Sequence, residues 1–539
     1  MCLRPHSLQP VPEETVRVAR AAFPKGNPYL TMRDTFGSLF QDPQFAALFP
    51  NCGQPALAPW RLALVILLQF VEGLSDRQAA DAVRRCLDWK YLLGLELTDP
   101  GFDASVLSEF RSRLVTGAAE TLLFDALLDL FRTHHLLKAG GRQRTDSTHV
   151  LAAVRALNRV EGVGETLRHA LNVLATVAPD WLRPHCPAEW GERYGRRFDE
   201  RLPKEGSQRE ALVTRIGQDG FTLLKAVFGE GTPEWLRQVP AVETLRQVWV
   251  QQYYRETGEE GAETMRWRTN AEIPPAAQFL GSPHDPEARY GKKGTTQWEG
   301  YKVHFTETCE PDAPHLITSV QTTPAPIADG DQTPVIQADL QAKDLLPEQQ
   351  IVDTGYLDAK LLVSSREEYG VDLLGPTRAD YHWQAREGQG FAASDFTIHF
   401  DAEYAVCPQG KRSSKWNLVL DRSGNPVIKI GFAGRDCGPC PCREQCTRSR
   451  QRRQTVTIRP EKEYQALQAA RLRKVTFVPE SAEKSHISAG RQWAARHMGQ
   501  PVRKNIPRTH FASPKINAQI AERHRRPPRT KPKRHPFGN

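Results

Sequence analysis

Apolar residues in the first part of the chain recur at intervals of three and four, which predicts helices. Pro59 suits the first turn of a helix whose apolar face continues to Phe70 and stops at Gly73. Ser75 and Gln78 have the spacing of a capping box, so a second helix should begin there. The expected helices cover Glu13–Phe23, Pro59–Phe70, Ser75–Val83, a segment from Asp103 or Ser105 to Leu114, and 119–137.

After residue 139 the pattern changes to short strand-like runs. The expected strands are Arg142–Val150, Tyr301–Thr306, His315–Thr323, Gln350–Asp353 and Val371–Gly375, with helices at Thr333–Ala342 and Ala359–Glu368. Strands that pair as a hairpin and then alternate with helices indicate an α/β sheet covered by helices. Amphipathic helices at Leu157–Val177, Ser207–Gly217 and Ala241–Tyr254 separate the first strand from the hairpin.

These patterns predict an α/β protein built from several parts. The chain is long enough for two to four domains. We expect a helical N-terminal domain at 1–138, a mixed-sheet core at 139–395 with a helical insertion at about 151–285, a cysteine-rich module at 396–460, and a C-terminal segment with a basic tail at 461–539.

Net charge alone says little about the partner of the folded part. The formal charge of the chain is +9, but residues 491–539 carry thirteen Lys and Arg against one acid. Without them, 59 bases face 62 acids, so the basicity belongs to the tail. That tail has no apolar periodicity and is expected to be disordered. No apolar run is long enough for a bilayer and no secretory signal opens the chain, so a cytoplasmic protein with reduced cysteines is expected.

Two aspartates at strand-like runs are the strongest candidates for chemistry. Asp146 lies in the strand at 142–150, and Asp353 ends the strand at 350–353 before Thr-Gly-Tyr. Carboxylates held on rigid strands can bind Mg²⁺, and two such ions suit phosphodiester cleavage. The alternative is that both are strand-end or turn residues without a ligand. His149 could approach the same site, although a structural role fits it better.

Cysteines gather between residues 407 and 446. Cys407, Cys437, Cys440 and Cys446 form a set that suits a closed, structural Zn²⁺ site, and Cys442 makes the fourth ligand ambiguous. A redox CxxC and unliganded thiols are the alternatives.

Basic residues supply candidate DNA contacts. Arg111 and Arg113 lie on a helix that could be the reader of a helix-turn-helix, and Arg77 precedes it. A compact basic patch follows the cysteines at Arg448, Arg450, Arg452 and Arg453. An ordinary bundle with solvated arginines and a solvated loop are the alternatives. Gly291-Lys-Lys-Gly-Thr lacks the upstream glycine of a P-loop, and no GxGxxG, HExxH or GxSxG occurs.

Several segments together resemble one known family. They are Val11–Thr15, Phe23–Pro28, Ala58–Ala63, Leu74–Val83, Asp88–Tyr91, Leu107–Arg111, Arg144–His149, Gly300–His304, Val352–Tyr356 and the cysteine set. Over residues 5–475 the chain resembles bacterial insertion-sequence transposases of the DDE type with an InsH-like N-terminal domain. The resemblance implies an RNase H-like core in which Asp146 and Asp353 are the first two catalytic acids, and a glutamate on a late helix as the third. It also implies Mg²⁺, terminal inverted repeats and target DNA as double-stranded partners, a homodimer or higher assembly on DNA, and a place at the nucleoid.

The end of the chain departs from that family pattern. The family continues after Gln468–Arg471 with a segment that carries the third acid, whereas this chain has Phe477-Val-Pro-Glu-Ser and the basic tail. Our hypothesis is a frame shift near Val475–Phe477 that removes the acid, with Glu480 and Glu483 as weak substitutes. The function expected is transposition, and the alternatives are an inactive relic that only binds DNA and a metal-dependent nuclease.

Overall fold

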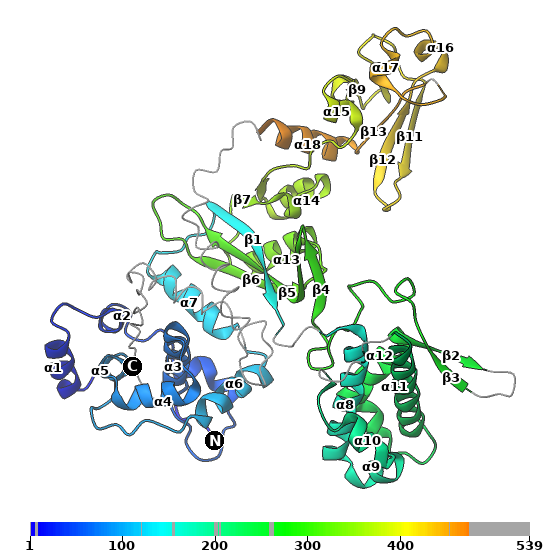
Figure 1. Cartoon of the computed structure of the whole chain (residues 1–539). Helices are drawn as coiled ribbons and strands as arrows, with labels where there is room; N and C mark the ends of the chain where they lie inside the picture. The colour runs from blue at the N-terminus through cyan, green and yellow to red at the C-terminus, as the bar shows by residue number, and fades with distance from the viewer. Residues whose placement is uncertain are drawn as a thin grey trace, which may run out of the picture.

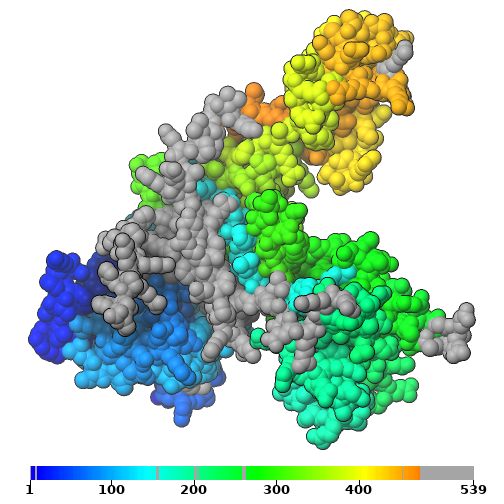
Figure 2. Space-filling view, viewed as in Figure 1, coloured from blue at the N-terminus to red at the C-terminus, as the bar shows by residue number. Residues whose placement is uncertain are grey.

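The computed structural model describes residues 2–5, 9–119, 121–152, 157–198, 203, 206–257, 263–451 and 453–473. These residues form a mixed α/β structure. Along the chain, a helical N-terminal part is followed by a central sheet, a second helical part inserted into the sheet's sequence, and a small cysteine-containing module (Figure 1). On the face shown in Figure 2, the inserted helices and the cysteine module are separate masses on either side of the sheet.

The N-terminal part packs its helices around α3, whose apolar residues are almost all buried. Its elements are α1 (Glu13–Ala22), α2 (Pro28–Phe36), the 3-10 helix η1 (Asp42–Leu48), α3 (Pro59–Glu72), α4 (Asp76–Arg85), α5 (Leu87–Leu93), α6 (Ser105–Thr116) and α7 (Leu122–Thr133). Gly73 ends α3 in a left-handed conformation, and the capping box of Ser75 and Gln78 begins α4, as predicted. Helix α5 is not predicted from the sequence, because the five consecutive residues from Trp89 to Leu93 are all buried and the segment has no helical periodicity of apolar and polar positions.

The central sheet has the strand order β6-β5-β1-β7-β8, with β4 pairing with the first residues of β5 on the same edge as β6. Its strands are β1 (Arg142–Leu151), β4 (Arg289–Lys293), β5 (Thr296–Thr308), β6 (Ile317–Pro324), β7 (Gln349–Val352) and β8 (Asp372–Leu374). Strands β1, β7 and β8 are parallel, and β5 runs antiparallel to β1. Helices α13 (Asp329–Ala342) and α14 (Ala359–Tyr369) follow β6 and β7.

The helices between β1 and β4 form a core of their own. They are α8 (Arg159–Val177), α9 (Pro179–His185), α10 (Ala188–Tyr194), α11 (Gly206–Val227), η3 (Glu234–Gln238) and α12 (Pro240–Gln252), followed by the hairpin β2 (Tyr253–Thr257) and β3 (Glu263–Trp267). Gly220 lets α11 approach α12, since a Cβ there would lie 2.0 Å from the ring of Trp249. The helix predicted at Ala241–Tyr254 ends at Gln252, because Tyr253 already pairs with Trp267.

The cysteine module is built from short elements. They are α15 (Trp383–Glu387), η5 (Ala393–Asp395), β9 (Thr397–His399), β10 (Tyr404–Val406), β11 (Lys415–Leu420), β12 (Pro426–Gly431), α16 (Gly434–Cys437), α17 (Arg443–Cys446) and β13 (Thr455–Ile458). Helix α18 (Glu461–Arg473) then returns to the sheet, where Lys462 and Arg473 form ion pairs with Glu367 and Asp372. The C-terminal segment predicted to be disordered lies outside the described residues.

Candidate active site

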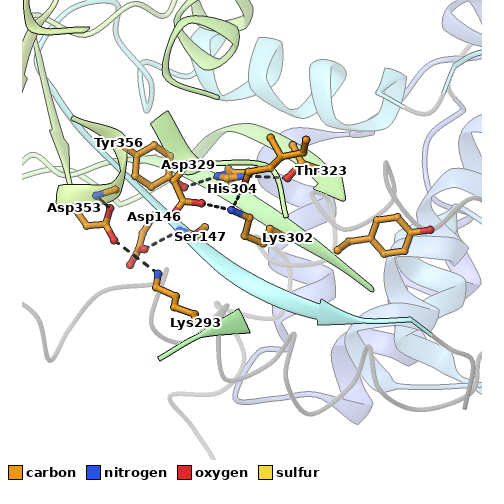
Figure 3. A network of polar contacts seen from close by, with 12 residues as sticks. Asp146, Ser147, Lys293, Lys302, His304, Thr323, Asp329, Asp353 and Tyr356 are labelled. Atoms are coloured by element: carbon orange, nitrogen blue, oxygen red, sulfur yellow. Dashed lines mark hydrogen bonds and ion pairs between the residues drawn. The ribbon is translucent and has the colours of Figure 1, made fainter. Parts of the chain in front are cut away.

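Asp146 and Asp353 lie next to each other on the two parallel strands at the centre of the sheet. The pairing of β1 with β7 runs as far as Thr145 opposite Val352, so each aspartate directly follows the last paired residue: Asp146 lies within β1 and Asp353 just after the end of β7. Neighbouring strands are about 4.8 Å apart, so the two carboxylates leave the sheet side by side (Figure 3). Each is oriented by a backbone N–H, from Ser147 to Asp146 at 2.7 Å and from Gly355 to Asp353 at 2.8 Å.

Asp353 also faces a lysine from the edge of the sheet. The Nζ atom of Lys293, at the end of β4, lies 3.9 Å from Oδ2 of Asp353 (Figure 3). This distance exceeds that of a hydrogen bond, so the contact is a loose ion pair. The side chains of Lys293 and Asp353 are 61% and 42% exposed, which leaves the pair open to solvent and to ligands.

A third carboxylate, Asp329, lies beside Asp353 at the start of α13. A Cβ on Gly355 would be 3.0 Å from Oδ2 of Asp329 and 3.0 Å from Oδ1 of Asp353, so both carboxylates approach the backbone of Gly355. The charge of Asp329 is already compensated, since its Oδ1 accepts a hydrogen bond from Nζ of Lys302 at 2.6 Å. The side chains of this second ion pair, Lys302 and Asp329, are only 11% and 13% exposed.

Tyr356 lies behind the acids and is held by a buried histidine. Burial and then the charges of Asp329, Asp146 and Asp353 raise the pKa of Tyr356 above its usual range, so its hydroxyl stays protonated. That hydroxyl hydrogen bonds to Nδ1 of His304. Burial lowers the pKa of His304 to about 4, so its ring is neutral, and Nε2 contacts the hydroxyl of Thr323 at 3.2 Å.

The carboxylates of Asp146, Asp353 and Asp329 lie together where the parallel pairing of β1 with β7 ends, and we call this cluster the acidic edge. It has the donor atoms for a hard divalent cation, because carboxylate oxygens are the ligands that Mg²⁺ prefers. Its charge already attracts one cation, the ammonium of Lys293. Among the described residues, however, no three His, Cys, Asp or Glu side chains are close enough together to form a ready-made metal site. Asp146 and Asp353 offer oxygen ligands that suit Mg²⁺, and further ligands would have to come from water, phosphate or another side chain.

His149, a candidate neighbour of this site from the sequence, lies on the other face of the sheet from Asp146. Residues three apart in a strand lie on opposite faces of the sheet. The ring of His149 packs against that of Trp298, with centroids 5.3 Å apart. The structure therefore supports the structural role.

The five cysteines of the C-terminal module line one pocket. Cys407, Cys437, Cys440, Cys442 and Cys446 all contribute to its wall. The backbone N–H of Lys411 points at Sγ of Cys407 at 3.3 Å. Burial and the four neighbouring sulfurs raise the pKa of Cys446 to about 12. The sulfurs thus converge on one cavity, although within the described part of the chain they too stop short of a ready-made metal site.

The candidate DNA-contacting arginines differ in how their charge is used. The side chain of Arg111 is only 14% exposed and its guanidinium pairs with Asp76 at 2.5 Å, so it joins α6 to α4. Arg111 therefore contributes to helix packing in this structure, and its assignment as a DNA contact stays a prediction. Arg113 pairs with Glu109, and Arg448 pairs with Glu387 and lies over the ring of Trp383. Arg77, Arg450 and Arg453 are exposed, whereas Arg452, Glu480 and Glu483 lie outside the described residues.

Sequence reasoning missed Asp329, Lys293 and Lys302. Lys302, His304 and Tyr356 lie within two segments that carried the family resemblance, and this was the available signal for them. Asp329 stood out only as an acid in the first turn of a helix. Its approach to Asp353 depends on how α13 packs on the sheet, which local sequence does not specify.

Comparison with protein families gives two matches on this chain. A family described as "Transposase domain (DUF772)" matches residues 17–113, and one described as "Transposase DDE domain" matches residues 406–489. Both support the resemblance to insertion-sequence DDE transposases, which is thereby confirmed. The second match continues past residue 475, where we placed the end of the resemblance, and it includes Glu480 and Glu483. No curated protein and no solved structure gave a significant match.

Across the residues that the structure describes, no helix combines the length and the apolar character needed to cross a bilayer.

Proposed function

We propose, from the premise that this chain is a relative of insertion-sequence DDE transposases, that it binds the ends of such an element and catalyses Mg²⁺-dependent DNA strand cleavage and transfer. The observation that carries the proposal is that Asp146 and Asp353 each directly follow the last residues that pair between β1 and β7, Thr145 and Val352. The strand order of the sheet, with one antiparallel strand beside three parallel ones, is consistent with an RNase H-like core.

In this mechanism Asp146 and Asp353 would hold the catalytic ions. Mg²⁺, when bound, supplies the positive charge that activates the attacking water or hydroxyl and stabilises the leaving oxygen. The two backbone N–H groups that contact the carboxylates keep them aimed at the edge of the sheet. Hydrolysis at the element end would break a P–O3′ bond and free a 3′-hydroxyl. This hydroxyl would attack a target phosphorus in line, forming a new P–O bond as the 3′-oxygen of the target strand leaves.

A third acid would complete the site. Glu480 and Glu483 are the candidates, since both lie within the matched range of the DDE family and neither lies in the described residues. The frame shift hypothesis predicts that neither acts. It is tested by sequencing the DNA of the element: if the family's usual ending is found in the present reading frame, the hypothesis is wrong.

DNA binding would use the helical N-terminal part and the exposed arginines. Arg77, Arg450 and Arg453 are the described exposed members of this set, and Arg113 and Arg448 would have to leave Glu109 and Glu387 to join them. Contacts of this kind go to phosphates, so affinity should fall steeply as salt rises. A homodimer or higher assembly on DNA is part of the same proposal.

The test is cleavage of a duplex made from the DNA that flanks the coding sequence, in Mg²⁺ and in EDTA. Asp146→Asn and Asp353→Asn should each lower the rate more than about 100-fold without loss of binding, because even outer partners of a metal site are worth 10–100-fold. Asp180→Asn is the matched control, since Asp180 is 93% exposed and is paired with its neighbour Arg183. Unchanged cleavage in both active-site variants would refute the proposal.

The same experiment separates the two alternative functions. Binding by the parent protein without cleavage would identify an inactive protein that only occupies element ends, as the departure of the C-terminal sequence suggests. Cleavage that is never followed by strand joining would identify a nuclease.

The cysteine pocket would hold a structural Zn²⁺. The convergence of five sulfurs and the N–H directed at Cys407 support this, because thiolates favour zinc and accept such hydrogen bonds. Metal analysis of the purified chain should give about one zinc per chain. Cys407→Ser should lose it and Cys442→Ser should keep it, whereas retention by both variants would contradict the assignment of Cys407.

A further inference from the structure

The two lysines near the acidic edge differ in how tightly they are held. Lys302 is buried, and its Nζ binds both Asp329 and the carbonyl oxygen of Ile327. Lys293 is mostly exposed and lies 3.9 Å from Asp353, without a hydrogen bond between them. Of the two, Lys293 can therefore exchange its partner at little cost, since exposed ion pairs contribute little free energy.

The backbone that carries Lys293 is nevertheless well fixed. Lys293 pairs with Thr296 at the end of the β4–β5 hairpin. The ring of Trp298 packs directly over Gly291, where a Cβ would be 2.7 Å from it. The indole N–H of Trp298 donates to the carbonyl oxygen of Tyr301. The hairpin thus fixes the backbone of Lys293 beside the acids, while its ammonium group is exposed.

From this geometry we propose that Lys293 alternates between two anions: it neutralises Asp353 when the site is empty of cation, and it binds a DNA phosphate next to the scissile bond when Asp353 is engaged by metal. The inference rests on the proposed function and names a substrate contact of the same site. A metal and the ammonium compete for one carboxylate, so a metal that binds Asp353 releases the exposed ammonium of Lys293, which can then contact a phosphate of the bound DNA. No bond is made or broken by Lys293 itself.

Two opposite effects follow for Lys293→Gln. In the absence of DNA, removing the competing charge should tighten Mn²⁺ binding roughly fivefold, the effect expected for unit charges about 4 Å apart in water. With DNA, loss of one phosphate contact should reduce the slope of log affinity against log salt by about 0.9. A residue that only stabilises the fold would not move these two quantities in opposite directions.

Lys292 provides the matched control. It is the neighbouring residue of the same strand, is exposed, and lies on the opposite face of the hairpin. Lys292→Gln should change neither quantity. Lys293→Arg keeps the positive charge and should resemble the parent protein in both.

The experiment uses the full chain, with Mn²⁺ alone followed by the spectroscopic signal of the free ion, and a duplex from the flanking DNA titrated at several salt concentrations in Ca²⁺. Asp353→Asn is measured alongside. If Asp353→Asn abolishes Mn²⁺ binding but Lys293→Gln leaves Mn²⁺ affinity and the salt slope unchanged, the role of Lys293 is refuted and the proposed function stands. If Mn²⁺ binding survives Asp353→Asn, the metal site of the proposed function is wrong, and this inference falls with it.

Discussion

The ion pair between Lys302 and Asp329 offers the sharpest test of how the acidic edge is held together. The two side chains are 11% and 13% exposed, and their charged atoms are 2.6 Å apart. We consider Asp329→Leu, which removes the carboxylate and leaves the ammonium of Lys302 buried beside the carbonyl oxygen of Ile327. A buried charge without a counter-charge is strongly destabilising.

The expected loss is about 3–5 kcal/mol, the range for breaking a buried pair by removing one partner. Because about 1.4 kcal/mol corresponds to a factor of ten, amides of β5 and α13 should exchange hydrogen on the order of 100- to 1,000-fold faster or more, if exchange follows this opening. Replacing both partners, as Lys302→Met with Asp329→Leu, should recover most of the loss, since a buried pair is often replaceable by apolar residues of similar volume.

The assay is hydrogen–deuterium exchange followed by mass spectrometry of peptides from β5 and α13. The control is Glu367→Leu, which breaks the pair with Lys462 at the same 2.6 Å but with side chains 75% and 53% exposed. That change should cost less than about 1 kcal/mol. A loss below about 1 kcal/mol in Asp329→Leu, or a double variant no more stable than the single one, would refute the reasoning.

Three further predictions concern the candidate site and the N-terminal helices. Burial holds the pKa of His304 near 4, below the usual 6.5 of an unfolded chain, so the unfolded state takes up a proton first as the pH falls. The free energy of unfolding should therefore decrease from pH 6.5 toward pH 4 by up to about 1.4 kcal/mol per pH unit. Pulse proteolysis in urea should show this dependence, and it should be flattened in His304→Gln. Gly355→Ala places a Cβ 3.0 Å from two carboxylate oxygens and should weaken Mn²⁺ binding roughly tenfold with the fold retained; calorimetry showing parental affinity would contradict this. Arg111→Met should lower the stability of the N-terminal helices by about 1–3 kcal/mol and leave the dependence of DNA affinity on salt unchanged. A weaker salt dependence at unchanged stability would instead show that Arg111 contacts DNA.

Much of the secondary structure could be predicted because its signals are local. The capping box at Ser75, the stop at Gly73 and the strand that carries Asp146 each depend on a few neighbouring residues. Short elements such as α5 and α10 were missed, because seven residues give too few repeats of a helical period. The end of α12 was misplaced by two residues, since strand pairing with β3 decides it.

For the candidate site, too, local features could be predicted from the sequence, whereas contacts between distant elements could not. The sequence by itself determined that Asp146 and Asp353 end or occupy strands, that five cysteines lie close together along the chain, and that the chain resembles a transposase family. Only the tertiary structure decided that β1 and β7 are neighbours, which brings the two carboxylates together, and that Asp329 and Lys293 reach the same edge. It also decided that Arg111 forms an ion pair with Asp76. The physical reason is that periodicity and capping are encoded in adjacent residues, whereas the pairing of charges depends on which surfaces are brought together when the separate elements pack.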